Sequence, residues 1–171
     1  MPLPVLAALS SAAATILIAN KQTVAVAESA CGGLISAALV AVPGASAFYI
    51  GGGIIYTAQG GKALLPPRPK GMQSATQEFA LFEARNIREK MGSSWGVGET
   101  GASGPSGNPY GNPPGHAVVA VSGPPSAKDP GQRIERAIIL ATGSANREEN
   151  MWAFAKAALD LLAEMAAQSG K

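Results

Sequence analysis

A carboxylate and a hydroxyl stand side by side where an apolar run ends. The run Val24-Ala-Val-Ala is followed by Glu28 and Ser29, and then at a short distance by Gly32-Gly33. Glu28 is the only acidic residue before Glu78, and a lone carboxylate is costly near a core without a purpose. The Ser29 hydroxyl could be a nucleophile, with glycine amides at a helix N-terminus holding an anion or oxyanion. The alternative is that Ser29 caps the helix that follows, and the residues alone favour that simpler role.

A serine nucleophile needs a base, and the composition leaves few candidates. His116 is the single histidine, and it begins a distant predicted strand. If Ser29 is a nucleophile, Lys62, helped by Tyr56, is the more plausible activating group, because a lysine in an apolar pocket loses its proton more easily. The residues alone favour a simpler role for each of the two. The simpler alternatives are a half-buried tyrosine at a strand end and an exposed lysine after the flexible Gly60-Gly61 pair.

Two further segments could bind a phosphate or a planar ring. The glycine-rich stretch 101–107 follows a predicted strand, and Thr100 and Ser103 could donate hydroxyls there. It has neither the P-loop nor the Rossmann spacing. Arg147 stands at the start of the final predicted helix, a natural place to meet a phosphate. A surface loop and a solvated arginine are the alternatives, and Cys31 is either a reactive thiol or a small buried residue.

The elements that would position these residues alternate between helix and strand. The apolar periodicity predicts helices over about residues 3–19, 30–42, 74–91 and 147–168, the third opened by a capping box at Ser74–Gln77. It predicts strands over about residues 23–27, 48–56, 95–100, 116–121 and 136–142. Because the strands are nearly continuous apolar runs, we expect an α/β fold with three α/β/α layers and a mostly parallel sheet, helices covering both faces. One domain spans residues 1–171 in this interpretation.

Composition excludes several classes of protein. Apolar residues make up 47% of the chain and charged residues 14%, so we expect part of the surface to face a partner subunit in a homo-oligomer, a dimer or larger. The net charge of +2 without a basic block argues against nucleic-acid binding. One cysteine and one histidine argue against a metal site and favour a reducing, cytoplasmic location. The apolar run 3–19 is short for a membrane span, so we expect a packing helix and no membrane association.

The motifs, in their order and spacing, resemble the CinA C-terminal domain family, the nicotinamide mononucleotide deamidases, from about Leu6 to Leu162. Residues 27–33 are similar to the family's Ala-Glu-Ser-Cys-Thr-Gly-Gly, and residues 43–47 to its Pro-Gly-Ser-Ser-Ala. Residues 51–56 match Gly-Gly-x-x-x-Tyr, and residues 100–107 resemble Thr-Gly-Ile-Ala-Gly-Pro-x-Gly. The region 143–147 is similar to Phe-x-Gly-x-Arg, with two extra residues before the arginine.

The resemblance implies hydrolysis of the carboxamide of nicotinamide mononucleotide, a pyridine nucleotide, to nicotinate mononucleotide and ammonia, without a metal or cofactor. Ser29 would be the nucleophile, Tyr56 and Lys62 would manage its proton, and Gly32 and Gly33 would help form the oxyanion site. The substrate-binding set that the resemblance implies is Glu28, Cys31, Gly32, Gly33, Ser46, Thr100, Gly101, Ser103, Gly104 and Arg147.

The chain departs from the family pattern at several positions. The family lysine stands five residues after the tyrosine, where this chain has Gly61, and Lys62 comes one residue later. Cys31 replaces a threonine, Met151 replaces a second arginine, and the loop 107–115 is longer. Two alternatives to an enzyme therefore remain open for this chain. It could be a catalytically impaired relative that binds a nucleotide or phosphate, or a structural or regulatory oligomer.

Overall fold

The computed structural model describes residues 5–126 and 128–169. In this part of the chain five strands form one sheet in the order β2-β1-β3-β4-β5. The strands are β1 (Val24–Glu28), β2 (Tyr49–Ile54), β3 (Trp95–Ala102), β4 (His116–Pro125) and β5 (Arg133–Ala141). The helices are α1 (Leu6–Ala19), α2 (Leu34–Val40), α3 (Ala58–Leu64), α4 (Gln77–Met91) and α5 (Arg147–Ser169), and a 3-10 turn covers Ala45–Ala47. The expected start of the first helix, at residue 3, lies outside the described residues.

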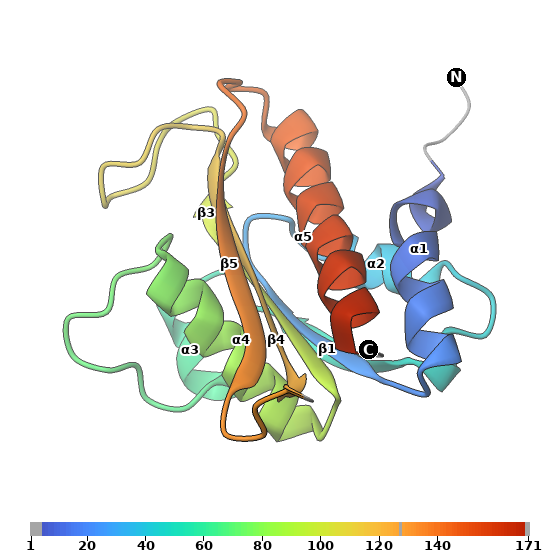
Figure 1. Cartoon of the computed structure of the whole chain (residues 1–171). Helices are drawn as coiled ribbons and strands as arrows, with labels where there is room; N and C mark the ends of the chain where they lie inside the picture. Colours follow the sequence, from blue (N-terminus) through green and yellow to red (C-terminus); the bar gives the residue numbers. More distant parts are fainter. Residues whose placement is uncertain (1–4, 127, 170–171) are drawn as a thin grey trace.

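Helices cover both faces of the sheet (Figure 1), which confirms the three-layer α/β/α prediction. Helices α1, α2 and α5 lie on one face, and α3 and α4 lie on the other. The expectation of a mostly parallel sheet is wrong. Strand β1 is parallel to β2 and β3, whereas β4 is antiparallel to both β3 and β5. The reason is that no helix connects β3 to β4 or β4 to β5, and a parallel crossover needs a long connection, usually a helix.

Three boundaries differ from the sequence prediction in ways that affect the site. Helix α2 begins at Leu34 after a Gly33 N-cap with φ of 101°, so residues 29–33 form a turn instead of the first helical turn. Segment Ala58–Leu64 is helix α3, not a flexible glycine loop. Helix α4 is capped by Thr76, whose Oγ1 accepts from the Phe79 amide at 3.2 Å, two residues after the expected cap.

The core lies on both faces of the sheet. On the α5 face Trp95, Phe154 and Leu17 are fully buried. On the other face α4 lies unusually close to β3, because β3 has glycines there: a Cβ at Gly98 would be 2.1 Å from the carbonyl oxygen of Ala80. Among the described residues no helix is long and apolar enough to cross a membrane.

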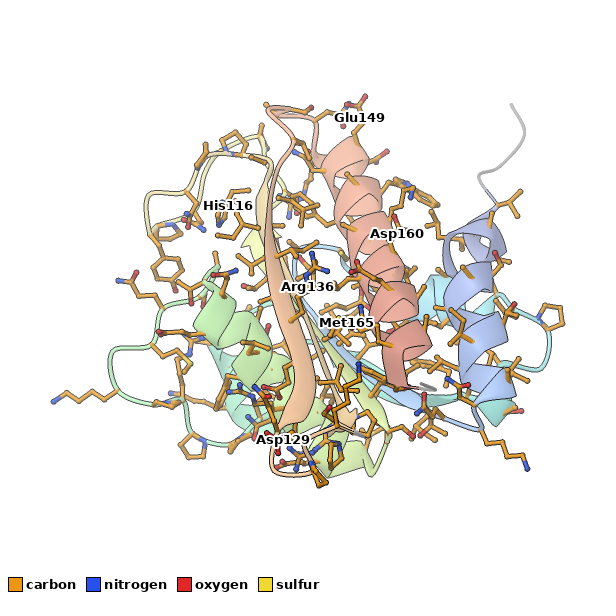
Figure 2. The ribbon with its side chains drawn as sticks, viewed as in Figure 1. His116, Asp129, Arg136, Glu149, Asp160 and Met165 are labelled. Carbon is orange, nitrogen blue, oxygen red and sulfur yellow. The ribbon has the colours of Figure 1, made fainter. Side chains whose placement is uncertain are left out.

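The carboxyl ends of the parallel strands β1, β2 and β3 meet at one edge of the sheet. Figure 2 shows His116 at the start of β4 and Glu149 near the start of α5 at the same end of the molecule, with Asp129 of the β4–β5 turn at the opposite end. From β1 the chain leaves along α2 on one face, and from β2 it leaves along α3 and α4 on the other. Open α/β sheets bind ligands at such a switch point.

Candidate active site

A cavity of about 900 Å³ opens at this edge. It brings together residues from five separate parts of the chain: the turn after β1, the end of β2 with α3, the α3–α4 loop with the start of α4, the end of β3 with the loop after it, and the start of α5. The residues predicted from sequence that line it are Ser29, Tyr56, Lys62, Thr100, Gly101, Ser103, Gly104 and Arg147.

Ser29 is half-buried at the end of β1 and lines the cavity. The N-cap of α2 is Gly33, not Ser29, so the capping alternative is wrong. Within residues 5–126 and 128–169 the Ser29 hydroxyl makes no hydrogen bond. It is therefore available to a ligand in the cavity.

The backbone amides of the turn are mostly occupied within the protein. The Gly32 amide donates to the Ser29 carbonyl at 3.0 Å, and the Gly33 amide donates to Glu28 Oε2 at 3.1 Å. These bonds correct the expectation that the two glycine amides form the oxyanion site. Ala30 lines the cavity, and its amide has no acceptor among the residues that the structure describes. Ala30 is thus the residue of the turn whose amide is not paired within the described structure.

Two buried carboxylates hold the turn. Glu28 is fully buried and accepts from the amides of Gly33, Ile35 and Ser36 and from the Ser36 hydroxyl, at 2.7–3.1 Å. The positive end of α2 thus satisfies this acid, which does not line the cavity. Glu99 of β3, also fully buried, accepts through Oε2 from the Ser29 and Cys31 amides at 3.0 and 2.9 Å.

The Glu99 carboxyl is only partly satisfied. Its Oε1 is buried and has no partner among the described residues. Burial raises the pKa of Glu99 to about 7, the Cys31 and Ser29 amides work against that shift, and Glu28 adds to it. Glu83 of α4 is buried with both oxygens unpaired in the described structure, and burial, followed by Glu99, raises its pKa well above the usual value. Burial therefore favours the neutral form of Glu83.

A tyrosine–arginine pair stands at the rim of the cavity. Arg147 Nη2 donates to the Tyr56 hydroxyl at 2.6 Å, and Arg147 Nη1 donates to the Gly104 carbonyl. Arg147 thus joins the end of β2 to the loop after β3. Lys62, in the last turn of α3, is exposed at the rim, and its ammonium makes no hydrogen bond within the described chain. Lys62 therefore does not lie in the apolar, desolvated pocket that the sequence analysis expects for it.

The hydroxyls of the glycine-rich loop position the site. Thr100 Oγ1 accepts from the Ala75 amide at 3.2 Å, and Ser103 Oγ donates to the Ala30 carbonyl at 2.8 Å. The side-chain amide of Asn150, a buried residue of α5, donates through Nδ2 to the Ser103 carbonyl at 2.7 Å. Because Ser103 uses its only proton on Ala30, its hydroxyl fixes the turn after β1 to the loop after β3.

Other predicted residues lie away from the cavity lining. They are Glu28, Cys31, Gly32, Gly33 and Ser46. Ser46 is exposed on the 3-10 turn. Cys31 is fully buried, and burial, with Glu99 and Glu28, raises the pKa of its thiol well above the usual value. Of the two interpretations of Cys31, the small buried residue is confirmed.

Sequence reasoning missed one wall of the cavity. The Arg68 guanidinium lies 4.1 Å from the centre of the Phe79 ring, and Phe82 stacks on Phe79 with ring centres 6.1 Å apart. Tyr110 of the long loop lines the cavity as well. The signal for Arg68 was its place among three prolines at 66, 67 and 69, which restrict the backbone of the loop that carries it.

No group of three or more His, Cys, Asp or Glu side chains that could hold a metal ion occurs among the described residues.

Comparisons with known proteins give the same family by sequence and by fold. Residues 6–166 match the family model described as CinA C-terminal domain. A CinA-like protein of Gloeobacter violaceus is 35% identical over 119 residues, covering 68% of this chain and 28% of that protein. One of Parasynechococcus marenigrum is 33% identical over 129 residues, 74% of this chain and 31% of the relative. The chain thus spans about a third or less of the length of these curated relatives.

Solved structures share the fold. A competence/damage-inducible protein of Agrobacterium tumefaciens superposes with a TM-score of 0.83 at 24% identity, covering 96% of this chain and 99% of that one. A CinA superfamily protein of Klebsiella pneumoniae gives 0.81 at 22% identity, over 95% and 98% of the two chains. Since the family model matches nearly the whole chain, this protein belongs to the CinA C-terminal domain family.

Proposed function

We propose that this protein is an amidohydrolase that converts nicotinamide mononucleotide to nicotinate mononucleotide and ammonia. The observation that carries the proposal is that Ser29, Lys62 and Arg147 line one cavity, although they lie far apart in the sequence. The cavity combines a free hydroxyl, an amine, two arginines and stacked aromatic rings. A ribonucleotide with a planar ring and a phosphate needs these partners.

The reaction proceeds through a covalent intermediate. Lys62, as the free amine, accepts the Ser29 proton while Oγ attacks the carboxamide carbon. The carbonyl oxygen becomes an oxyanion, for which the open Ala30 amide is the donor in place of the glycine amides. The tetrahedral intermediate expels ammonia with the proton from Lys62, leaving a nicotinoyl ester on Ser29. Water, deprotonated by Lys62, then attacks the ester, and the acid leaves as Ser29 recovers its proton.

The substrate's phosphate and ring supply the binding energy. Arg147 donates to Tyr56 and Gly104 at the rim, and a guanidinium at the start of α5 supports phosphate binding there. The stacked Phe79 and Phe82 rings suit the face of a pyridine. A substrate seated between these groups covers the exposed Lys62 from solvent, which favours the neutral amine that the reaction needs.

An ammonia-release assay tests the activity. Purified protein is incubated with nicotinamide mononucleotide, nicotinamide riboside and nicotinamide, with a chelator present. We expect ammonia from the mononucleotide, none from Ser29→Ala, and normal turnover from the matched control Ser11→Ala on the exposed side of α1. Binding of the nucleotide without ammonia from the wild type would contradict the enzyme.

The exposure of Lys62 favours a second candidate, a relative that binds the nucleotide without hydrolysing it. Moving the lysine by one position along α3 distinguishes the two candidates. Gly61 also lines the cavity, and a Cβ there would be 3.6 Å from Ile55 Cγ2, an ordinary contact. Lys62→Ala should abolish turnover, and Gly61→Lys in that background should restore part of it if a lysine on α3 is the base. In a binding protein, neither change alters the nucleotide affinity more than a few-fold.

We also propose a homo-oligomer. The two edge strands expose Ile50 and Ile54 on β2 and Ile139 on β5, each close to half exposed or more. Exposed apolar side chains on sheet edges favour association. Sedimentation velocity at micromolar concentration measures the mass directly, and a concentration-independent monomer contradicts this proposal.

A further inference from the structure

Glu99 lies directly beneath the turn that carries Ser29. Its Oε2 accepts from the Ser29 amide at 3.0 Å and from the Cys31 amide at 2.9 Å, so one oxygen holds the backbone on both sides of Ala30. The only other side-chain bond to this stretch is from Ser103 to the Ala30 carbonyl, within the described residues. A carboxylate from the neighbouring strand therefore holds the backbone of the nucleophile itself, together with the bonds that Glu28, Ser103 and the turn's own backbone supply.

The surroundings of Glu99 are acidic. Glu28 faces it from β1 and Cys31 from the turn, and both interact with it electrostatically. After burial, the charge of Glu99 is also a cause of the raised pKa of Glu83 on α4. The groups that favour the ionised form are the two backbone amides and the Cys31 thiol. With burial dominating, the pKa of Glu99 is about 7, so the carboxylate and the carboxylic acid are both populated near neutral pH.

We propose that Glu99 is a positioning residue: its carboxylate fixes the Ser29 turn for attack, and its protonation releases the turn. The inference rests on the proposed hydrolysis at Ser29. Amide-to-carboxylate hydrogen bonds are about twice as strong as neutral ones. Protonation of Glu99 weakens the hydrogen bonds that it accepts from the Ser29 and Cys31 amides. The new O–H group then needs an acceptor among the oxygens that surround it. The turn then shifts, and the hydroxyl loses its alignment.

A purely structural role would not require an ionisable group. A glutamine oxygen can accept from the same two amides without carrying a charge into a fully buried site. The carboxylate brings a desolvation cost that glutamine avoids, and its Oε1 gains no partner in return within the described chain. The negative charge of Glu99 therefore distinguishes the proposed role from a purely structural one.

The first measurement follows the backbone directly. The ¹⁵N shifts of the Ser29 and Cys31 amides are recorded in wild-type protein between about pH 5.5 and pH 8.5. We expect both to titrate together with a midpoint near 7, and both to lose that transition in Glu99→Gln. Glu78→Gln, an exposed carboxylate on α4, is the matched control and keeps it. Flat wild-type amide shifts overturn the proposal without reference to any variant.

The second measurement follows catalysis. For ammonia release, kcat/KM of the wild type should fall more steeply with decreasing pH below about pH 7. Glu99→Gln should lack this additional fall, whereas the dependence on the Lys62 base is common to both proteins. We expect kcat of the variant to fall about tenfold, with KM nearly unchanged, because two charge-assisted bonds become neutral. An unchanged pH profile in the variant overturns the proposal. If the amides titrate but no ammonia forms, the coupling of Glu99 to the turn stands and the proposed reaction fails.

Discussion

Replacing Glu99 with glutamine should make the stability of the fold less sensitive to pH. Burial raises the pKa of Glu99 from 4.5 to about 7, so between these values the folded protein keeps a proton that the unfolded chain releases. The free energy of unfolding therefore falls as pH rises through this window. The full difference corresponds to about 3 kcal/mol, present below about pH 4.5 and lost above about pH 7. Glutamine has no such proton, so the variant does not lose this contribution.

The assay is urea unfolding, followed by tryptophan fluorescence, of the wild type and Glu99→Gln at several pH values. The quantity that matters is the difference in unfolding free energy between the two proteins, because other titrating groups contribute to both. We expect this difference to change in favour of the variant by about 3 kcal/mol between about pH 4.5 and about pH 8. Glu78→Gln should show a nearly constant difference. A change below about 0.5 kcal/mol for Glu99→Gln, or one in favour of the wild type, refutes the buried-carboxylate reasoning.

Three further substitutions or reactions test the packing and the site. Gly98→Ala should lower the unfolding free energy by about 1–3 kcal/mol or more, measured by urea unfolding, since its Cβ would lie 2.1 Å from the Ala80 carbonyl; an unchanged midpoint would contradict the close approach of α4. Cys31 should react with iodoacetamide about 100-fold more slowly than free cysteine until urea is added, because it is fully buried with a raised pKa; rapid labelling of folded protein would refute this. Arg147→Met should raise KM for nicotinamide mononucleotide about tenfold and leave KM for the riboside nearly unchanged; an equal rise for both would place the phosphate elsewhere.

The sequence predicted the elements that carry the site because their signals are local. The apolar run 24–27 is a buried strand, and the glycines after it allow the left-handed turn at Gly32 and Gly33. Arg147 begins the final helix as expected. Strand-end motifs could also be placed at one edge of the sheet, since parallel strands end together.

The parts that sequence reasoning missed depend on contacts between distant segments. Whether β4 returns antiparallel is decided by its pairing with β3, and the apolar run 116–121 reads the same in either direction. Helix α3 contains Gly60 and Gly61, which disfavour a helix in isolation, yet the Thr57 cap closes its first turn. Which amides of the turn are paired depends on Glu99, seventy residues along the chain from Ser29.

Glu28 and Glu99 show how a similar sequence signal leads to two different physical outcomes. Each is an acid in a buried strand, Glu28 at the last position of β1 and Glu99 within β3, and each is fully buried. Glu28 accepts four hydrogen bonds at the start of α2, so its charge is well compensated. Glu99 accepts two, and its second oxygen has no partner in the described structure. The carboxylate of Glu99 therefore lowers stability at the pH where it holds Ser29 in place, and a glutamine that stabilises the fold while slowing hydrolysis would demonstrate that trade-off.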